Sequence, residues 1–115
     1  MTSAAVARAA ALPDPELVSG IRRASRAAGV DFGYLMAQAA RESGFRPDAK
    51  ARTSSATGLF QFVEATWLDL VKRHGGAHGI VADASDAELL ALREDPALSA
   101  AMAAEYPREN KARLE

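Results

Sequence analysis

The sequence predicts an all-α fold, and three observations carry this prediction. Alanine, the strongest helix former, occupies 27 of the 115 positions. Alternating apolar and polar residues, the pattern of a strand, are hard to find over four or more positions, and β-branched residues are few. Residues that start or end helices recur along the chain, with Asp-Pro pairs at Asp14 and Asp95 and glycines at Gly29 and Gly44.

The composition is that of one small globular domain, 49 % hydrophobic and 25 % charged. Cysteine is absent, which excludes disulfides, a thiol nucleophile and a thiolate metal site. A net charge of −1 argues against nucleic-acid binding driven by bulk charge, so no nucleic-acid partner is expected. No apolar run approaches the roughly 18 residues that a membrane helix needs, and residues 1–12 are too weakly hydrophobic for a signal peptide.

Residues 1–13 are expected to form a flexible N-terminal arm, and residues 14–115 the domain. Asp14 can cap a helix whose first turn holds Pro15, and Gly29 is expected to end that helix. Its predicted buried stripe is Leu17, Val18, Ile21, Ala24 and Ala28. Its arginine face, expected to be exposed, is Arg22, Arg23 and Arg26.

A second helix is predicted over residues 32–43. Asp31 is placed to cap it, and Gly44, followed by the apolar Phe45, is placed to end it. Residues 46–57 are rich in polar and turn-forming types and predict a loop. We expect a short helical piece at residues 58–63.

One further helix is predicted after this loop. Thr66 is expected to cap or enter a helix that runs to His74, with Trp67, Leu70 and Val71 turned inward. The glycines at 75, 76 and 79 predict a flexible connector.

The C-terminal part predicts two helices. The Ser-Asp-Ala-Glu sequence at 85–88 is a capping box for a helix through Arg93. Asp95 and Pro96 start the last helix, which Pro107 is expected to kink or end.

Glu42 is an unusual residue in the predicted second helix. At about 100° per residue, Glu42 lies within about 20° of Leu35, on the apolar face that also holds Ala39. It also lies in the last turn, where the helix dipole is negative. Both surroundings favour a protonated carboxyl and a raised pKa, which suits a general acid. The alternative from position alone is a glutamate at the rim of the stripe that reaches out to water.

Two motifs in order resemble those of the soluble lytic transglycosylase (SLT) family. Residues 42–47 read Glu-Ser-Gly-Phe-Arg-Pro, and residues 58–62 read Gly-Leu-Phe-Gln-Phe, with phenylalanine where methionine is commoner. The similarity is clear over residues 30–75 and looser over 83–114. It implies a lysozyme-like, all-α domain.

The resemblance places Glu42 on the family's single catalytic acid/base. Such enzymes are carbon–oxygen lyases that cleave the β-1,4 bond between N-acetylmuramic acid and N-acetylglucosamine in peptidoglycan and form a 1,6-anhydro ring. The reaction consumes no water and needs no cofactor or metal. The implied partners are peptidoglycan glycan strands, and the implied site of action is the periplasm or cell wall, by an export route that the sequence does not identify.

Four further residues are candidates for substrate binding through the resemblance. Gln61 falls on the motif glutamine, whose amide can exchange hydrogen bonds with sugars. Ser43 is expected near the acid, Gly58 permits close approach of backbone or sugar, and Phe60 either lines the cleft or belongs to the core.

Other constellations are weaker. Glu64 is an alternative second carboxylate for a hydrolase, but its position favours a solvated helix start. His74 and His78 are four residues apart but separated by two glycines, so we expect no zinc site there. The arginine face is expected to be solvated.

Domains of the SLT family continue beyond the length of this chain, so we expect it to hold only the N-terminal portion, incomplete on the C-terminal side. Either a longer chain or a partner chain would then complete the cleft, and activity of these residues alone is left open. The main alternative is a non-catalytic or truncated peptidoglycan-binding or assembly module. A helical nucleic-acid-binding domain is a weaker one, because no basic recognition helix is present.

Overall fold

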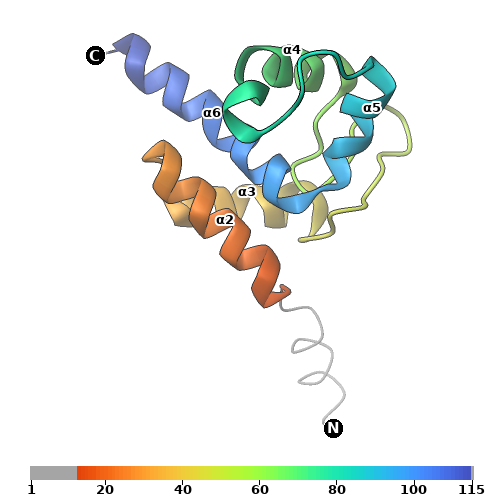
Figure 1. The fold of residues 1–115 in the computed structure, drawn as a ribbon. Coiled ribbons are helices and arrows are strands. Elements are labelled where there is room, and N and C mark those ends of the chain that lie inside the picture. The colour runs from red at the N-terminus through yellow and green to blue at the C-terminus, as the bar shows by residue number, and fades with distance from the viewer. Residues whose placement is uncertain (1–12, 115) are drawn as a thin grey trace, which may run out of the picture.

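The computed structural model describes residues 13–114, the last five of them by their backbone alone. The predicted N-terminal arm lies almost wholly outside the described residues. The elements in chain order are α2 (Pro15–Ala28), α3 (Phe32–Ser43), α4 (Glu64–His74), the 3-10 helix η1 (Gly75–His78), α5 (Asp86–Ala91), the 3-10 helix η2 (Leu92–Glu94) and α6 (Pro96–Leu114). The predicted all-α fold is confirmed (Figure 1).

The first two helices begin and end at the predicted residues, because side chains next to them satisfy the free backbone groups. Asp14 Oδ1 accepts from the Glu16 amide at 2.8 Å, and Asp31 Oδ2 accepts from the Tyr34 amide at 2.8 Å. Gly29 and Gly44 end the two helices in the left-handed conformation, with φ of 68° and 62°.

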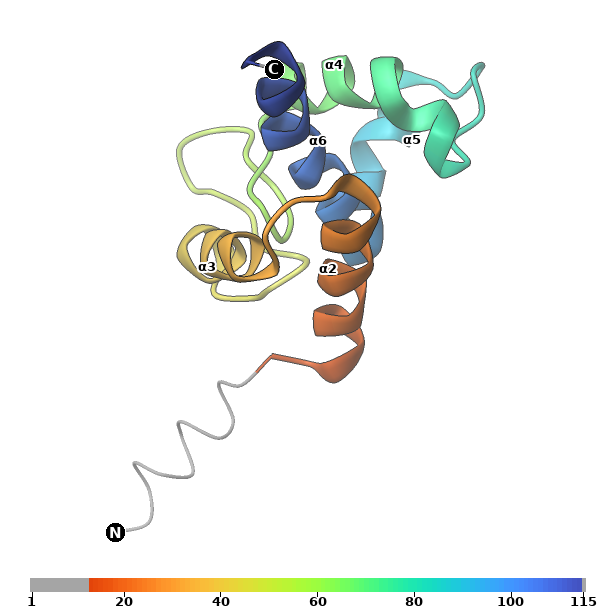
Figure 2. The same cartoon turned by 90° about the vertical axis from the view of Figure 1, so that its left-hand side faces the viewer.

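The core lies where α2 and α6 pack together, with α3 and α4 on either side (Figures 1 and 2). Small residues allow this close packing: a Cβ on Gly20 would lie 3.6 Å from the Cα of Ala97. The buried face of α2 holds Leu17, Gly20, Ile21, Ala24 and Ser25. Val18 and Ala28, predicted in the stripe, are only half-buried.

The arginine face of α2 is exposed as predicted. The guanidinium carbon of Arg22 lies 4.2 Å from the centroid of the Phe32 ring, which favours a cation–π contact between α2 and the start of α3.

Trp67 anchors α4 in the core. Its side chain is fully buried, its Nε1 donates to the Leu89 carbonyl at 2.6 Å, and its ring lies 5.1 Å from that of Phe62. The predicted inward face of α4, which also includes Leu70 and Val71, is confirmed. Thr66 enters this helix and does not cap it, because α4 begins at Glu64.

The helical piece predicted at 58–63 is wrong, because residues 58–61 form a tight turn. Gly58 and Gln61 have φ of 91° and 53°, outside the helical range. The backbone N–H of Gln61 donates to the Gly58 carbonyl, and the backbone N–H of Thr57 donates to the Phe62 carbonyl, both at 3.1 Å. Isolated antiparallel bridges therefore join Thr57 to both Lys50 and Phe62.

The C-terminal half departs from prediction in three places. Residues 75–78, expected as a flexible connector, form η1. The capping box at Ser85 and Glu88 is confirmed, but the helix it starts ends at Ala91 and continues as the separate η2. Helix α6 runs past Pro107 to Leu114, so Pro107, which was expected to kink or end the helix, does not end it.

Across residues 13–114, no helix combines the length and apolar character needed to cross a membrane.

Candidate active site

Glu42 lies in the last turn of α3, on the face that carries Leu35 and Ala39. Those two residues are fully buried, whereas the Glu42 side chain is 40 % exposed. Its Oε2 lies 4.0 Å from Nε of Arg41, an exposed pair that screening by water keeps weak. The helix thus presents a carboxylate to solvent at the edge of the core.

Ser43 joins the end of α3 to the 58–61 turn. Its side chain is buried, and its Oγ lies 2.7 Å from the Leu59 carbonyl and 3.2 Å from the Ala39 carbonyl. The same oxygen accepts from the Arg46 amide at 3.1 Å. Because Ser43 follows Glu42 directly, these bonds hold the candidate acid beside the turn.

Gln61 is half-buried, and both hydrogens of its side-chain amide are donated to carbonyl groups of the protein. Its Nε2 donates to the Ala49 carbonyl at 3.0 Å and to the Gly58 carbonyl at 2.9 Å. Its side-chain oxygen is the group left to receive a hydrogen bond from a ligand. The glutamine therefore closes the turn on itself and ties it to the preceding loop.

Phe60 and Gly58 are both buried within this segment. Phe60 is 5 % exposed and belongs to the same hydrophobic cluster as Leu59 and Phe62. A Cβ on Gly58 would overlap the carbonyl oxygen of Arg93. Of the two expectations for Gly58, close approach of backbone is thus what the structure contains, and Phe60 faces the core.

Arg93 also contacts the segment that carries the 58–61 turn, and nothing in the sequence predicted this role. Its side chain is buried, and its Nη1 donates to the carbonyls of Ser55 and Phe62 at 2.6 and 3.0 Å. An arginine at the end of a predicted helix gives no signal of burial, because arginine is mostly exposed. Its partners are backbone atoms, which sequence patterns do not mark.

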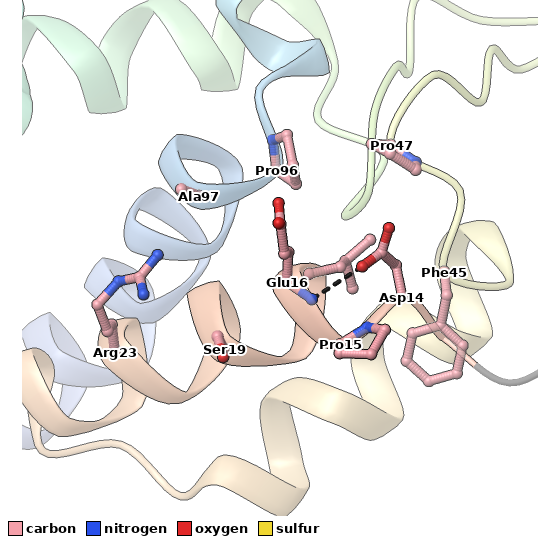
Figure 3. A pocket seen from close by; sticks show the side chains of 10 residues that line it. Asp14, Pro15, Glu16, Ser19, Arg23, Phe45, Pro47, Pro96 and Ala97 are labelled. Atoms are coloured by element: carbon pink, nitrogen blue, oxygen red, sulfur yellow. Dashed lines mark hydrogen bonds between the residues drawn. The ribbon is translucent and has the colours of Figure 1, made fainter.

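A cavity of about 630 Å³ opens beside the N-terminus of α2 (Figure 3). Its wall includes Phe45 and Pro47, which follow the end of α3, but not Glu42. Arg23 and Glu16 contribute charged side chains from α2, and Pro96 closes the side at α6. The candidate acid thus stands outside this cavity.

Glu64, the alternative second carboxylate, is exposed at the first residue of α4. Its backbone amide donates to Ser55 Oγ at 3.0 Å, so the residue is fixed by its backbone.

The two histidines pair with carboxylates of α6. His74 Nε2 lies 2.5 Å from Glu109 Oε2, and His78 Nε2 lies 3.2 Å from Oε2 of the buried Glu105. Hydrogen bonding from His74, with Arg73 adding to it, holds the pKa of Glu109 below its ordinary value. In the described part of the chain, no three His, Cys, Asp or Glu side chains are grouped so as to hold a metal ion.

Comparison with protein families agrees with the motifs. The family model described as "Transglycosylase SLT domain" matches residues 19–115. The match contains Glu42, the 58–61 turn and Arg93, and this family has a lysozyme-like helical fold and acts on peptidoglycan. The resemblance and the fold class read from the sequence are therefore confirmed, and the chain belongs to the transglycosylase SLT domain family.

Proposed function

We propose that the chain is a peptidoglycan lytic transglycosylase in which Glu42 is the single acid/base. The substrate bond is the β-1,4 link between N-acetylmuramic acid and N-acetylglucosamine. The observation that carries the proposal is the position of Glu42, a solvent-accessible carboxylate fixed to a buried hydrogen-bonded junction through Ser43. Family membership supports the substrate class.

In the first step, Glu42 donates its proton to the glycosidic oxygen, and the bond from that oxygen to C1 of the muramoyl residue breaks. A bound glycan would exclude the solvent that reaches Glu42 and bring the carboxyl against the glycosidic oxygen. The acetamido group of the substrate stabilises the positive charge that develops at C1.

In the second step, the Glu42 carboxylate takes the proton of the muramoyl 6-hydroxyl while the oxygen of this hydroxyl bonds to C1. The 1,6-anhydro ring closes, the acid is regenerated, and no water enters the product. One carboxylate is therefore enough, unlike in the usual two-carboxylate glycosidase.

The remaining candidates act through the 58–61 turn. Gln61 contacts the glycan through its side-chain oxygen, which accepts from a sugar hydroxyl or an acetamido N–H, because its amide hydrogens are already used. Ser43, Gly58 and Phe60 support substrate binding from within the protein by fixing that turn.

A second candidate is a non-catalytic or truncated peptidoglycan-binding or assembly module with the same fold. The observation in its favour is that the neighbouring cavity does not include Glu42, so its surroundings are open. A partner chain or a further segment would then complete the cleft, and the site of action in either case is the periplasm or cell wall.

The test is digestion of purified peptidoglycan by the full chain, with products identified by mass spectrometry. Glu42→Gln keeps the size of the side chain and removes the acid, and Glu64→Gln is the matched control at an exposed helix start. We expect 1,6-anhydromuramoyl products from the wild type and from Glu64→Gln, and a loss of at least about a hundredfold in Glu42→Gln. Reducing-end products would contradict the proposal, and glycan binding without products would favour the second candidate.

A further inference from the structure

Arg93 connects both ends of the segment that carries the 58–61 turn. One nitrogen of its guanidinium, Nη1, donates to the carbonyls of Ser55 and Phe62, which flank the turn. Its Nε donates to the Leu90 carbonyl at 3.0 Å, which fixes the guanidinium to the end of α5. A single buried side chain thus closes the base of the loop.

The partners of Arg93 are neutral. Among the described side chains, no carboxylate lies within ion-pair distance of its guanidinium. A buried cation is costly unless its donors are satisfied, and charge pairing does not offset that cost here. The hydrogen bonds to backbone carbonyls therefore determine the conformation of the loop rather than neutralise a charge.

The backbone of Arg93 also faces the turn. Its carbonyl oxygen accepts from Ser99 Oγ at 2.8 Å and lies against Gly58, where a Cβ would overlap it. The next residue, Glu94, pairs with Lys50 at 3.6 Å on the other side of the loop. Several independent bonds thus fix the position of η2 relative to the turn.

We propose that Arg93 is a positioning residue for glycan binding: it holds Ser55 and Phe62 at a fixed separation and thereby fixes the turn that carries Gln61 and that accepts the hydrogen bond of Ser43, the residue next to Glu42 in the chain. The consequence for glycan binding rests on the proposed function. The effect of Arg93 on the conformation of the turn does not depend on that function, so the two effects are tested by separate measurements.

The first measurement is amide hydrogen exchange of the full chain, in wild type, Arg93→Gln and Arg73→Gln. Arg73 is a matched control, since its guanidinium pairs with Asp69 of its own helix and with Glu109 of α6. Arg93→Gln is expected to speed exchange of the Thr57 and Gly58 amides at least about tenfold, while amides in α2 and α3 keep their wild-type protection. Equal effects of the two variants on these amides would overturn the proposal.

Arg93→Lys covers the case in which Arg93→Gln does not fold. Lysine keeps the charge and reaches the two carbonyls with one nitrogen, but it loses the Nε bond to Leu90. Its exchange rates at Thr57 and Gly58 are expected to lie between those of the wild type and of a strongly disrupted turn. Unchanged rates in a folded Arg93→Lys, together with loss of folding in Arg93→Gln, would mean that Arg93 supports the whole domain and does not position the turn.

The second measurement is the kinetics of peptidoglycan cleavage. Arg93→Gln is expected to raise KM about tenfold with little change in kcat, because it moves a binding group and leaves the acid in place. Arg73→Gln should change neither constant. A fall in kcat with KM unchanged would overturn the positioning role. An inactive wild type that does not bind glycan would refute the proposed function and the binding role together, while hydrogen exchange would still decide whether Arg93 fixes the turn.

Discussion

Two junctions hold this small domain together, and they use different chemistry. The turn junction, at the candidate site, consists of Ser43, Gln61 and Arg93 with the carbonyls that they bind. The helix junction, between the end of α4 with η1 and α6, consists of Arg73, His74, His78, Glu105 and Glu109. The first depends on hydrogen bonds to backbone atoms, and the second on titratable and charged pairs.

The difference places the sensitivity to pH and salt away from the candidate site. Hydrogen bonds to backbone carbonyl groups, including those from the permanently charged Arg93, have no group that titrates near neutral pH, whereas the partly exposed pairs of Glu109 weaken when this carboxylate is protonated or screened. The geometry around Glu42 is therefore expected to persist over a range of pH in which the contacts between α4 and α6 change. Three substitutions test this comparison, from the largest expected effect to the smallest.

Gly58→Ala is expected to be the most damaging change at the turn junction. The new Cβ would overlap the Arg93 carbonyl, and φ of 91° is strained for any L residue. We expect a loss of about 3 kcal/mol or more in the free energy of unfolding, measured by urea denaturation. The control is Gly29→Ala, also at positive φ, where an added Cβ would meet no atom of another described part of the chain within 4 Å; about 1 kcal/mol is expected for it. Equal losses would mean that close packing on Arg93 is not the constraint.

Ser43→Ala breaks the link between α3 and the turn. It removes the bond to the Leu59 carbonyl and leaves the Arg46 amide without its partner, so we expect a loss of about 1–2 kcal/mol. Ser54→Ala, at an exposed serine that accepts from the Ala56 amide, should cost a few tenths of a kcal/mol, about the usual effect at the surface. If thermal denaturation ranks the two serines the other way, the link through Ser43 does not stabilise the fold.

Glu109→Gln tests the helix junction, with an expected effect below about 1 kcal/mol. The pKa of Glu109 is lowered in the folded protein, so ionisation stabilises the fold above the ordinary value of 4.5, and this contribution is lost as pH falls through the folded pKa. The stability difference between wild type and Glu109→Gln should thus be present at pH 7, shrink below about pH 4.5, and shrink in high salt. A difference that stays constant from pH 7 to pH 3 would contradict the assignment.

The parts of the fold that the sequence predicted well are those with local causes. The bounds of α2 and α3 follow from Asp14, Asp31 and the two terminal glycines, which act within a few residues of themselves. The apolar spacing likewise predicted that Trp67 would be buried.

The 58–61 turn had no such local cause. Its shape depends on Ala49, Arg93 and Ser43, which are distant in sequence, and its apolar residues resemble a short helix when read alone. The candidate acid was located by two motifs read together, whereas position in the helix alone favoured a solvated glutamate at the rim of the apolar stripe. The spacing of residues also gave no means of finding Arg93.

The most direct test of the account is digestion of peptidoglycan in water labelled with oxygen-18. In the proposed reaction the 6-hydroxyl of the substrate closes the ring, so the muramoyl products carry no label and are one water lighter than hydrolysis products. We predict unlabelled 1,6-anhydro products from the wild type and none from Glu42→Gln. Incorporation of one labelled oxygen at C1 would mean that water is the nucleophile, and it would contradict Glu42 as the single acid/base of a lytic transglycosylase.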